Sequence, residues 1–101
     1  MIGADLSAAI VTHTNFYDSN LTSVNMSGLD LTGTTLVGVD LSGKDIADAI
    51  LTDANLTNAI LTGADLTNAI LTGAILTDAN LENAVLTNAI LNCVGHSICI
   101  S

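Results

Sequence analysis

The chain has 101 residues, 50% of them hydrophobic, and its ten acidic residues against one basic residue give a formal net charge of −9. This charge excludes binding of nucleic acid or anionic lipid through a basic patch. No apolar run approaches the roughly 18 residues that cross a bilayer. The opening residues, Met-Ile-Gly-Ala-Asp, carry no visible secretory signal. We therefore expect a cytoplasmic protein with no membrane contact and no direct nucleic-acid binding.

A five-residue repeat runs without insertion from Ala4 to Cys93, so that 90 residues divide into 18 units of five. The third residue of every unit is apolar, and it is Leu in 14 units. The first residue is Ala in 11 units, and all ten carboxylates occupy the second, fourth or fifth position. Because an unpaired buried carboxylate is costly, we expect the first and third positions to face inward and the others to face solvent.

The composition of the outward positions predicts a short extended stretch followed by a turn. The fifth residue is Gly, Asn or Asp in most units, and these are the residues that turns accommodate best. The fourth is Thr in ten units, a residue that favours β structure. A single unit cannot bury its Leu alone, so the units must stack as a solenoid.

From residue 49 the units read Ala-Ile-Leu-Thr-Asp, Ala-Asn-Leu-Thr-Asn, Ala-Ile-Leu-Thr-Gly and Ala-Asp-Leu-Thr-Asn. This pattern resembles the Ala-(Asp/Asn)-Leu-x-x motif of the pentapeptide-repeat protein family. The resemblance implies an all-β fold, a right-handed quadrilateral parallel β-helix with four units per coil, Leu in its centre and Ala at its corners. We expect about 4.5 coils from residues 1–93, and a tail at residues 94–101 that covers the last coil.

With four units per coil, residues 20 apart stack in columns along the solenoid. The predicted interior column is Leu31, Leu51, Leu71 and Leu91. One outward column, with a neighbouring corner residue, forms a candidate acidic contact face of Asp5, Asp45, Asp48 and Asp65. The adjoining outward column forms a candidate apolar contact face of Ile10, Ile50, Ile70 and Ile90. Such β-branched ladders also stabilise a sheet without binding anything, and we favour that interpretation of the Ile column.

Lys44 is the one charged residue at an inward position, in the same column as Val24 and Ala64. A charged lysine there must reach water or pair with a carboxylate, for which Asp40 and Asp45 are candidates. We expect a local bulge that lets the ammonium group reach the surface.

The tail places Cys93, His96 and Cys99 at even spacing. Structural zinc takes four ligands, so these three residues are a weak match to a metal site. A disulfide between Cys93 and Cys99 is sterically feasible, but free thiols are favoured in a reducing cytosol. Neither end of the solenoid has a recognisable capping helix, so we also consider homodimerisation through a coil end.

Catalysis needs a nucleophile, a base and an orienting group that converge in a cleft. The sequence offers none, since His13 and His96 lie at opposite ends, and we expect no enzymatic activity, no metal and no cofactor. The leading hypothesis is a non-enzymatic protein-interaction or scaffold module with an unknown protein partner. Because some members of the resembled family mimic duplex DNA, an alternative is a DNA mimic that acts on DNA gyrase or topoisomerase. A third is an ice-binding protein that uses the Thr and Ile face, which Asp30 and Asp53 interrupt.

Overall fold

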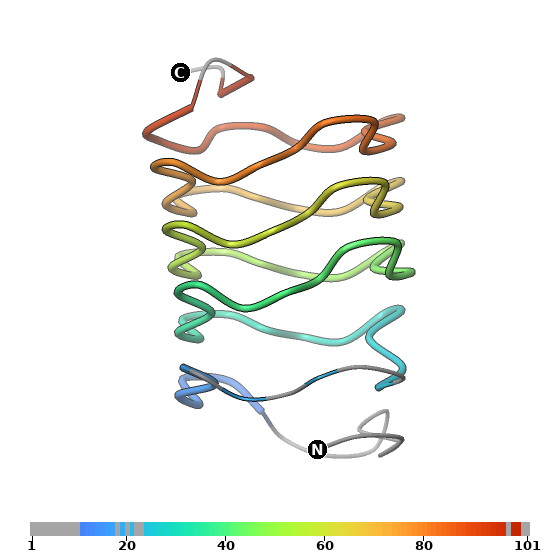
Figure 1. The fold of residues 1–101 in the computed structure, drawn as a ribbon. Coiled ribbons are helices and arrows are strands. Elements are labelled where there is room, and N and C mark those ends of the chain that lie inside the picture. Colours follow the sequence, from blue (N-terminus) through green and yellow to red (C-terminus); the bar gives the residue numbers. More distant parts are fainter. Residues whose placement is uncertain (1–10, 18, 20, 22–23, 97, 100–101) are drawn as a thin grey trace.

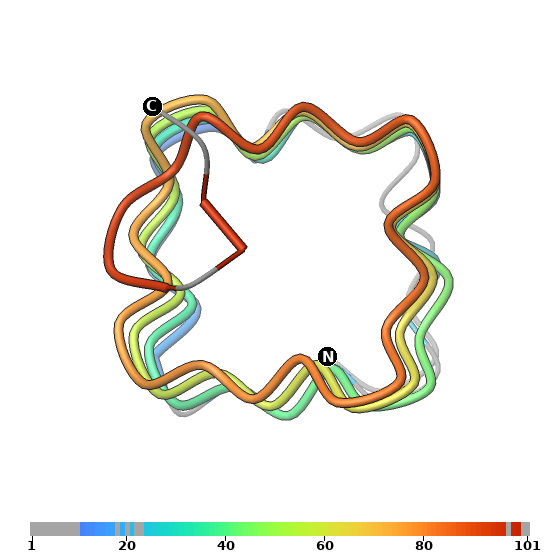
Figure 2. The same ribbon diagram turned by 90° about the horizontal axis from the view of Figure 1, so that it is seen from above.

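The structure, a computed structural model, describes residues 11–17, 19, 21, 24–96 and 98–99. Through these residues the chain winds as a stack of coils (Figure 1) with an almost square outline when seen along the stack (Figure 2). Each side of the square is one five-residue unit, which fits the prediction of four units per coil.

Within the described residues there is no helix, and each strand is a single bridge residue, at the second position of a unit in every case except Val94, which follows the last unit. The two residues of each described bridge pair lie 20 positions apart in the chain and pair in parallel, except for Ile75 and Val94 at the last turn. The described bridges form four columns: Asn15–Thr35–Asn55–Ile75–Val94, Asp30–Ile50–Ile70–Ile90, Asp40–Ile60–Asn80 and Asp45–Asp65–Val85. The predicted stacking of residues 20 apart is therefore confirmed for these columns. The total number of coils stays a prediction, because it depends on residues 1–10 as well.

The corners of the square are turns that the fifth residue of each unit makes possible. Every described fifth residue from His13 to Asn88 has a φ between 58° and 73°. The N–H of the next residue donates to the carbonyl of the third residue, as Ala49 does to Ile46 at 3.2 Å. A positive φ at the third of four turn residues is the signature of a type II turn, which Gly and Asn adopt most readily. The predicted turn position is thus confirmed.

The walls are held by hydrogen bonds between coils. The N–H of Leu31 donates to Ile50, that of Gly33 donates to Thr52, and that of Ile50 donates back to Leu29, at 2.6–2.9 Å. Among the described residues, the backbone N–H of the fourth residue in a unit does not donate to the neighbouring coil. Where the second residue is Asp or Asn, its side chain accepts this N–H, as in the pair Thr57 and Asn55 at 3.1 Å. The Asp/Asn preference at the second position therefore has a local backbone cause.

The interior is a column of third-position side chains, and those described from Val11 to Leu76 are all buried. First-position residues from Val24 to Ala79 are buried as well, with Lys44 as the exception. Between Met26 and Leu81 the column leaves no space for a water molecule. Since burial of one Leu side chain contributes about 1.5–3 kcal/mol, this column supplies the main stabilisation of the fold. The predicted inward positions are confirmed through Ala79.

The one buried polar side chain among the described residues is Thr34, at a first position. Its hydroxyl donates to the carbonyl oxygen of Leu31 at 2.8 Å, which removes the cost of burying it. In the described part of the chain, no helix is long and apolar enough to cross a membrane.

Candidate interaction surfaces

The ladder between coils is interrupted beside Lys44. Its Nζ donates a hydrogen bond to the carbonyl oxygen of Val24 at 2.9 Å, one coil away. In the regular register that carbonyl accepts the N–H of Asp45. Four backbone bonds of the regular ladder are missing here among the described residues. Each would join the N–H of the first residue to the carbonyl of the second: Asp40 to Ser19, Leu21 to Asp40, Asp45 to Val24 and Met26 to Asp45. Pairing resumes at Phe16 with Thr35 and at Gly28 with Ala47.

A surface hollow of about 480 Å³ lies at this interruption, and its polar lining includes Asn25, Asp40, Ser42, Lys44 and Asp45. Burial lowers the pKa of Lys44 below its usual value. The N–H and then the hydroxyl of Ser42 hold the pKa of Asp40 below its usual value. The ammonium group binds a carbonyl rather than either of the carboxylates predicted to pair with it. This lining contains no histidine or cysteine, and its groups make a polar recess rather than a catalytic constellation.

Three members of the predicted acidic face are described. Asp45 and Asp65 are bridge partners, so their carboxylates stand in register on adjacent coils. Each accepts the N–H two residues later, from Ala47 and Thr67 respectively, at 3.0 Å. Asp48 is exposed at a corner, and Asp5 lies outside the described residues. The hydroxyl and then the N–H of Thr67 lower the pKa of Asp65. Through these bonds, Asp45 and Asp65 stabilise the backbone of the turns that follow them.

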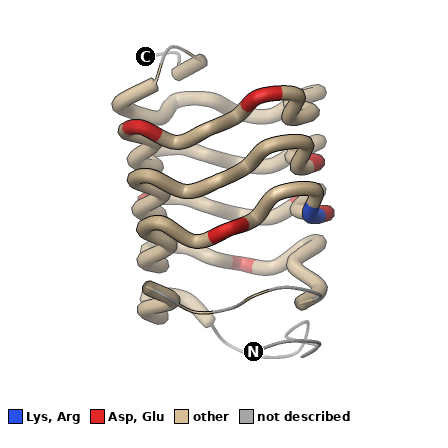
Figure 3. Tube along the Cα trace, viewed as in Figure 1, with Lys and Arg blue, Asp and Glu red and all other residues tan. Residues whose placement is uncertain are grey.

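The described carboxylates are spread around the solenoid. The bridge columns place Asp30, Asp40 and Asp45 on three different sides, and Figure 3 shows acidic positions on several sides and levels of the stack. The one basic residue of the chain lies among them. The negative charge therefore surrounds the body instead of forming one continuous acidic strip.

The predicted apolar face is continuous from Ile50 to Ile90, and Asp30 occupies the same column one coil before Ile50. Ile50 bridges Ile70, and Ile70 bridges Ile90. Ile50 and Ile70 are half-buried, whereas 45% of Ile90 is exposed. Ile10 lies outside the described residues. Among the described residues, the exposed large apolar side chains other than Tyr17 all lie from Ile60 onward: Ile60, Ile75, Val85, Ile90 and Val94.

The predicted interior column is placed as expected. Leu31, Leu51 and Leu71 are at most 2% exposed, while Leu91 is half-buried and packs against the core at the end of the stack. The column is thus fully buried in the middle of the solenoid, whereas its last member, Leu91, is partly exposed to solvent.

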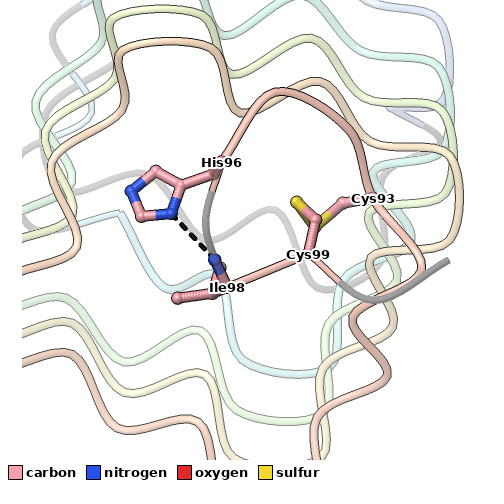
Figure 4. Close-up of a disulfide and its surroundings, with 4 residues drawn as sticks. All are labelled: Cys93, His96, Ile98 and Cys99. Carbon is pink, nitrogen blue, oxygen red and sulfur yellow. Dashed lines mark hydrogen bonds between the residues drawn. A yellow bond between two sulfur atoms is a disulfide. The ribbon is translucent and has the colours of Figure 1, made fainter.

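The tail carries a disulfide between Cys93 and Cys99, whose Cα atoms lie 4.9 Å apart (Figure 4). The preference for free thiols in the sequence interpretation is therefore wrong for this structure, because the tail folds back and brings the two side chains together. Nδ1 of His96 accepts the N–H of Ile98 at 3.2 Å, so the three residues do not converge as metal ligands. Among the described residues, no cluster of three or more His, Cys, Asp or Glu side chains could hold a metal ion.

The hollow beside Lys44 was not predicted as a surface feature, although its cause is visible in the sequence. Lys44 is the one charged residue at a first position. The sequence does not say in which direction the side chain turns, because that depends on the coil 20 residues earlier.

The comparisons with known proteins agree with this geometry. A family model described as pentapeptide repeats matches the chain in 8 copies, at residues 1–38, 36–73, 49–88 and 71–94. Among solved structures, the chain is similar to the pentapeptide repeat protein Rfr23 from the cyanobacterium Cyanothece 51142, with 38% identity and a TM-score of 0.52 over 84% of this chain. It spans 63% of that protein's chain, which is less than two thirds of it.

It is also similar to alr5209, a pentapeptide repeat protein from Nostoc Pcc 7120, with 32% identity and a TM-score of 0.65. This match covers 85% of the present chain and 71% of the other. No curated protein matches the sequence.

Proposed function

Because the chain belongs to the pentapeptide-repeat family, whose members form right-handed quadrilateral β-helices, we propose that it is a non-enzymatic protein-interaction module. Its contact face is the column of Ile50, Ile70 and Ile90. The observation that carries the proposal is the position of these side chains, which stand in register on three successive coils of one wall. Such a wall presents a flat, regularly spaced surface to a protein partner.

Charge and exposure support this choice. After Asp65 the chain has only two carboxylates, Asp78 and Glu82. Among the described residues, four of the six exposed large apolar side chains lie in this same part: Ile75, Val85, Ile90 and Val94. The central part of a protein interface is depleted of charged residues. The later coils therefore have the surface composition of a contact region, and the earlier coils have that of a solvated one.

The arrangement of charge gives DNA mimicry less support, since the described carboxylates of the bridge columns are spread over three sides of the body. A DNA mimic is expected to compete with DNA for gyrase in a salt-sensitive way, and failure to inhibit supercoiling would remove this alternative. The ice-binding alternative uses the same wall as our proposal, where Asp30 and the corner residue Asp53 interrupt the Thr and Ile pattern. An absence of thermal hysteresis would remove that one.

The test is a variant with Ile50→Thr, Ile70→Thr and Ile90→Thr, compared with the unaltered protein in quantitative pull-downs from its native cells. Thr35 occupies a bridge position on another wall of the same solenoid, so threonine fits this kind of position and the fold should be kept. We expect the variant to capture at least tenfold less of its specific partner, because three apolar contacts are removed from the centre of the face.

The matched control carries Ile60→Thr, Ile75→Thr and Val85→Thr, which removes exposed apolar side chains from the other three sides. This control should keep the partner. Equal capture by both variants, with unchanged thermal stability, contradicts a contact role for the Ile column.

A further inference from the structure

The gap beside Lys44 separates two coils that are in register on both sides of it. Regular bonds between these coils are present at Phe16 and at Gly28, at 2.8 and 2.9 Å. Between these two points the stem of Lys44 spans the gap, and its Nζ donates to the carbonyl of Val24 on the preceding coil. The hollow of about 480 Å³ at this place has the size of a ligand site, for which about 300–1,000 Å³ is typical.

Asp45 presents free backbone groups to this gap. At a regular second position such as Thr35, the N–H donates to the preceding coil and the carbonyl accepts from it, at 3.0 and 2.8 Å. Asp45 also stands at a second position, so its N–H and carbonyl face the preceding coil, but no described residue pairs with either of them. Asp40 is in the same situation. Each of these two residues therefore has a donor and an acceptor with which an extended chain can form a β bridge.

The side chains around the gap favour a cationic ligand. Asp40 and Asp45 outnumber Lys44, and the whole chain carries a net charge of −9. Each carboxylate uses its Oδ1 to accept the N–H two residues later, at 3.0 Å, and its Oδ2 has no donor among the described residues. The N–H and then the hydroxyl of Ser42 lower the pKa of Asp40, so this carboxylate is ionised at neutral pH. A guanidinium or ammonium group therefore finds free acceptor oxygens in the hollow.

We propose that the gap binds an extended peptide segment with a basic side chain. The peptide backbone pairs with the free N–H and carbonyl of Asp45, as in the addition of a strand to an open sheet edge, and its cationic group bonds to the carboxylates of Asp40 and Asp45. A simple amine would leave the N–H of Asp45 without an acceptor. Lys44 is the spacer that keeps the edge open. The site belongs to the columns of Asp40 and Asp45, so it goes beyond the contact face proposed above and is tested apart from it.

The first test measures the fluorescence anisotropy of a labelled, terminally blocked peptide, Thr-Arg-Thr-Arg-Thr, as the full chain is added. We expect saturable binding that weakens as the salt concentration is raised. The same peptide with methylated backbone nitrogens keeps its charge but cannot donate to the carbonyl of Asp45, and it should bind about tenfold more weakly. The proposal is overturned if the first peptide shows no saturable binding, or if the two peptides bind equally.

Two substitutions of Lys44 separate an open gap from a general attraction of cations. Lys44→Ala should let the ladder close and weaken peptide binding about tenfold or more, although it removes a positive charge. Lys44→Met keeps the length of the stem and should bind the basic peptide at least as tightly as the unaltered protein. General attraction to an acidic protein predicts tighter binding by both variants, because both lose the same charge, and that result would contradict the site.

The two carboxylates are tested by combining Asp40→Asn with Asp45→Asn. Asparagine keeps the acceptor that the turn needs at a second position, as Asn55 shows, so the fold should be retained, which circular dichroism checks. This double variant should bind the basic peptide about tenfold more weakly. The matched control combines Asp53→Asn with Asp78→Asn, which removes the same charge from two exposed corners, and it should keep the affinity. Equal losses in the two double variants would contradict a site between Asp40 and Asp45.

Discussion

The ammonium group of Lys44 donates a hydrogen bond to the carbonyl oxygen of Val24, and this side-chain contact stands where the regular ladder would place the N–H of Asp45. The lysine stem is too long for a corner that alanine fills at Ala64, one coil further on. The coil above is regular, since Asp65 donates to the Lys44 carbonyl at 2.9 Å. The side chain therefore separates its own coil from the preceding one.

We expect Lys44→Ala to stabilise the protein. Removal of the stem lets Asp45 pair with Val24 and Met26 pair with Asp45. Two such bonds contribute about 1–3 kcal/mol together, which raises Tm by several degrees in a chain of this size. Thermal unfolding measures the gain, and amide hydrogen exchange at Met26 and Asp45 should slow. Lys44→Met keeps the bulk of the stem and serves as the control, for which no such gain is expected. A lower Tm for Lys44→Ala would show that the lysine supports the fold as it stands.

Substitution of the interior leucines should have a cost that depends on their position along the stack. Leu61 is 1% exposed, and Leu61→Ala leaves a cavity in a column without free space, at a cost of about 2–5 kcal/mol. Leu91 is half-buried at the end of the stack, so Leu91→Ala should cost less than half as much. Urea unfolding of both variants checks the difference, and equal costs would argue against the open end.

The stability should decrease in acid because of the aspartates at second positions. Thr32 bonds to Asp30 through its hydroxyl and N–H, and similar bonds from Ser42 and Thr67 lower the pKa of Asp40 and Asp65. A carboxylate with a lower pKa in the folded state stabilises the fold fully above its unfolded pKa, and this contribution is lost as pH falls through the folded pKa. We expect Tm to decline progressively below about pH 4.

The control for this pH dependence replaces the same three aspartates by asparagine, which keeps an acceptor oxygen for the turn but does not titrate. Thermal unfolding between neutral and strongly acidic pH should give a flatter profile for this variant. A profile as steep as that of the unaltered protein would assign the acid sensitivity to other groups.

Gly63 tests the turn geometry without any packing effect. It has a φ of 69°, and a Cβ added there meets nothing within 4 Å. Asn58 and Asn68 occupy the same repeat position with φ values of 61° and 62°, so Gly63→Asn should change the unfolding free energy by less than about 0.5 kcal/mol. Gly63→Val should cost about 1–3 kcal/mol, because a β-branched residue resists this conformation. Equal stability of the two variants would contradict a conformational role for the fifth position.

The sequence by itself determined the features that repeat with every unit. The repeat has a period of five, its third residue is always apolar, and its carboxylates lie only at the second, fourth and fifth positions. This pattern is sufficient to predict which side chains point inward. Gly, Asn and Asp at the fifth position predict the turns, because few other residues adopt a positive φ at low cost. These features are local or periodic, and the structure confirms the buried third positions from Val11 to Leu76 and the buried first positions from Val24 to Ala79, except Lys44.

Only the tertiary structure decided how the exceptions are accommodated. The contact of Lys44 with Val24 joins residues 20 apart. The direction in which the lysine side chain turns depends on which neighbouring coil moves away to make room for it. The bond between Cys93 and Cys99 depends on how the tail folds over the end of the stack, and the sequence favoured free thiols instead. Even the second-position aspartates acquire their role from folding, because their carboxylates accept backbone N–H groups that the ladder leaves unpaired. A periodic sequence predicts its periodic contacts, whereas contacts that break the period are decided by the three-dimensional neighbours of each exception.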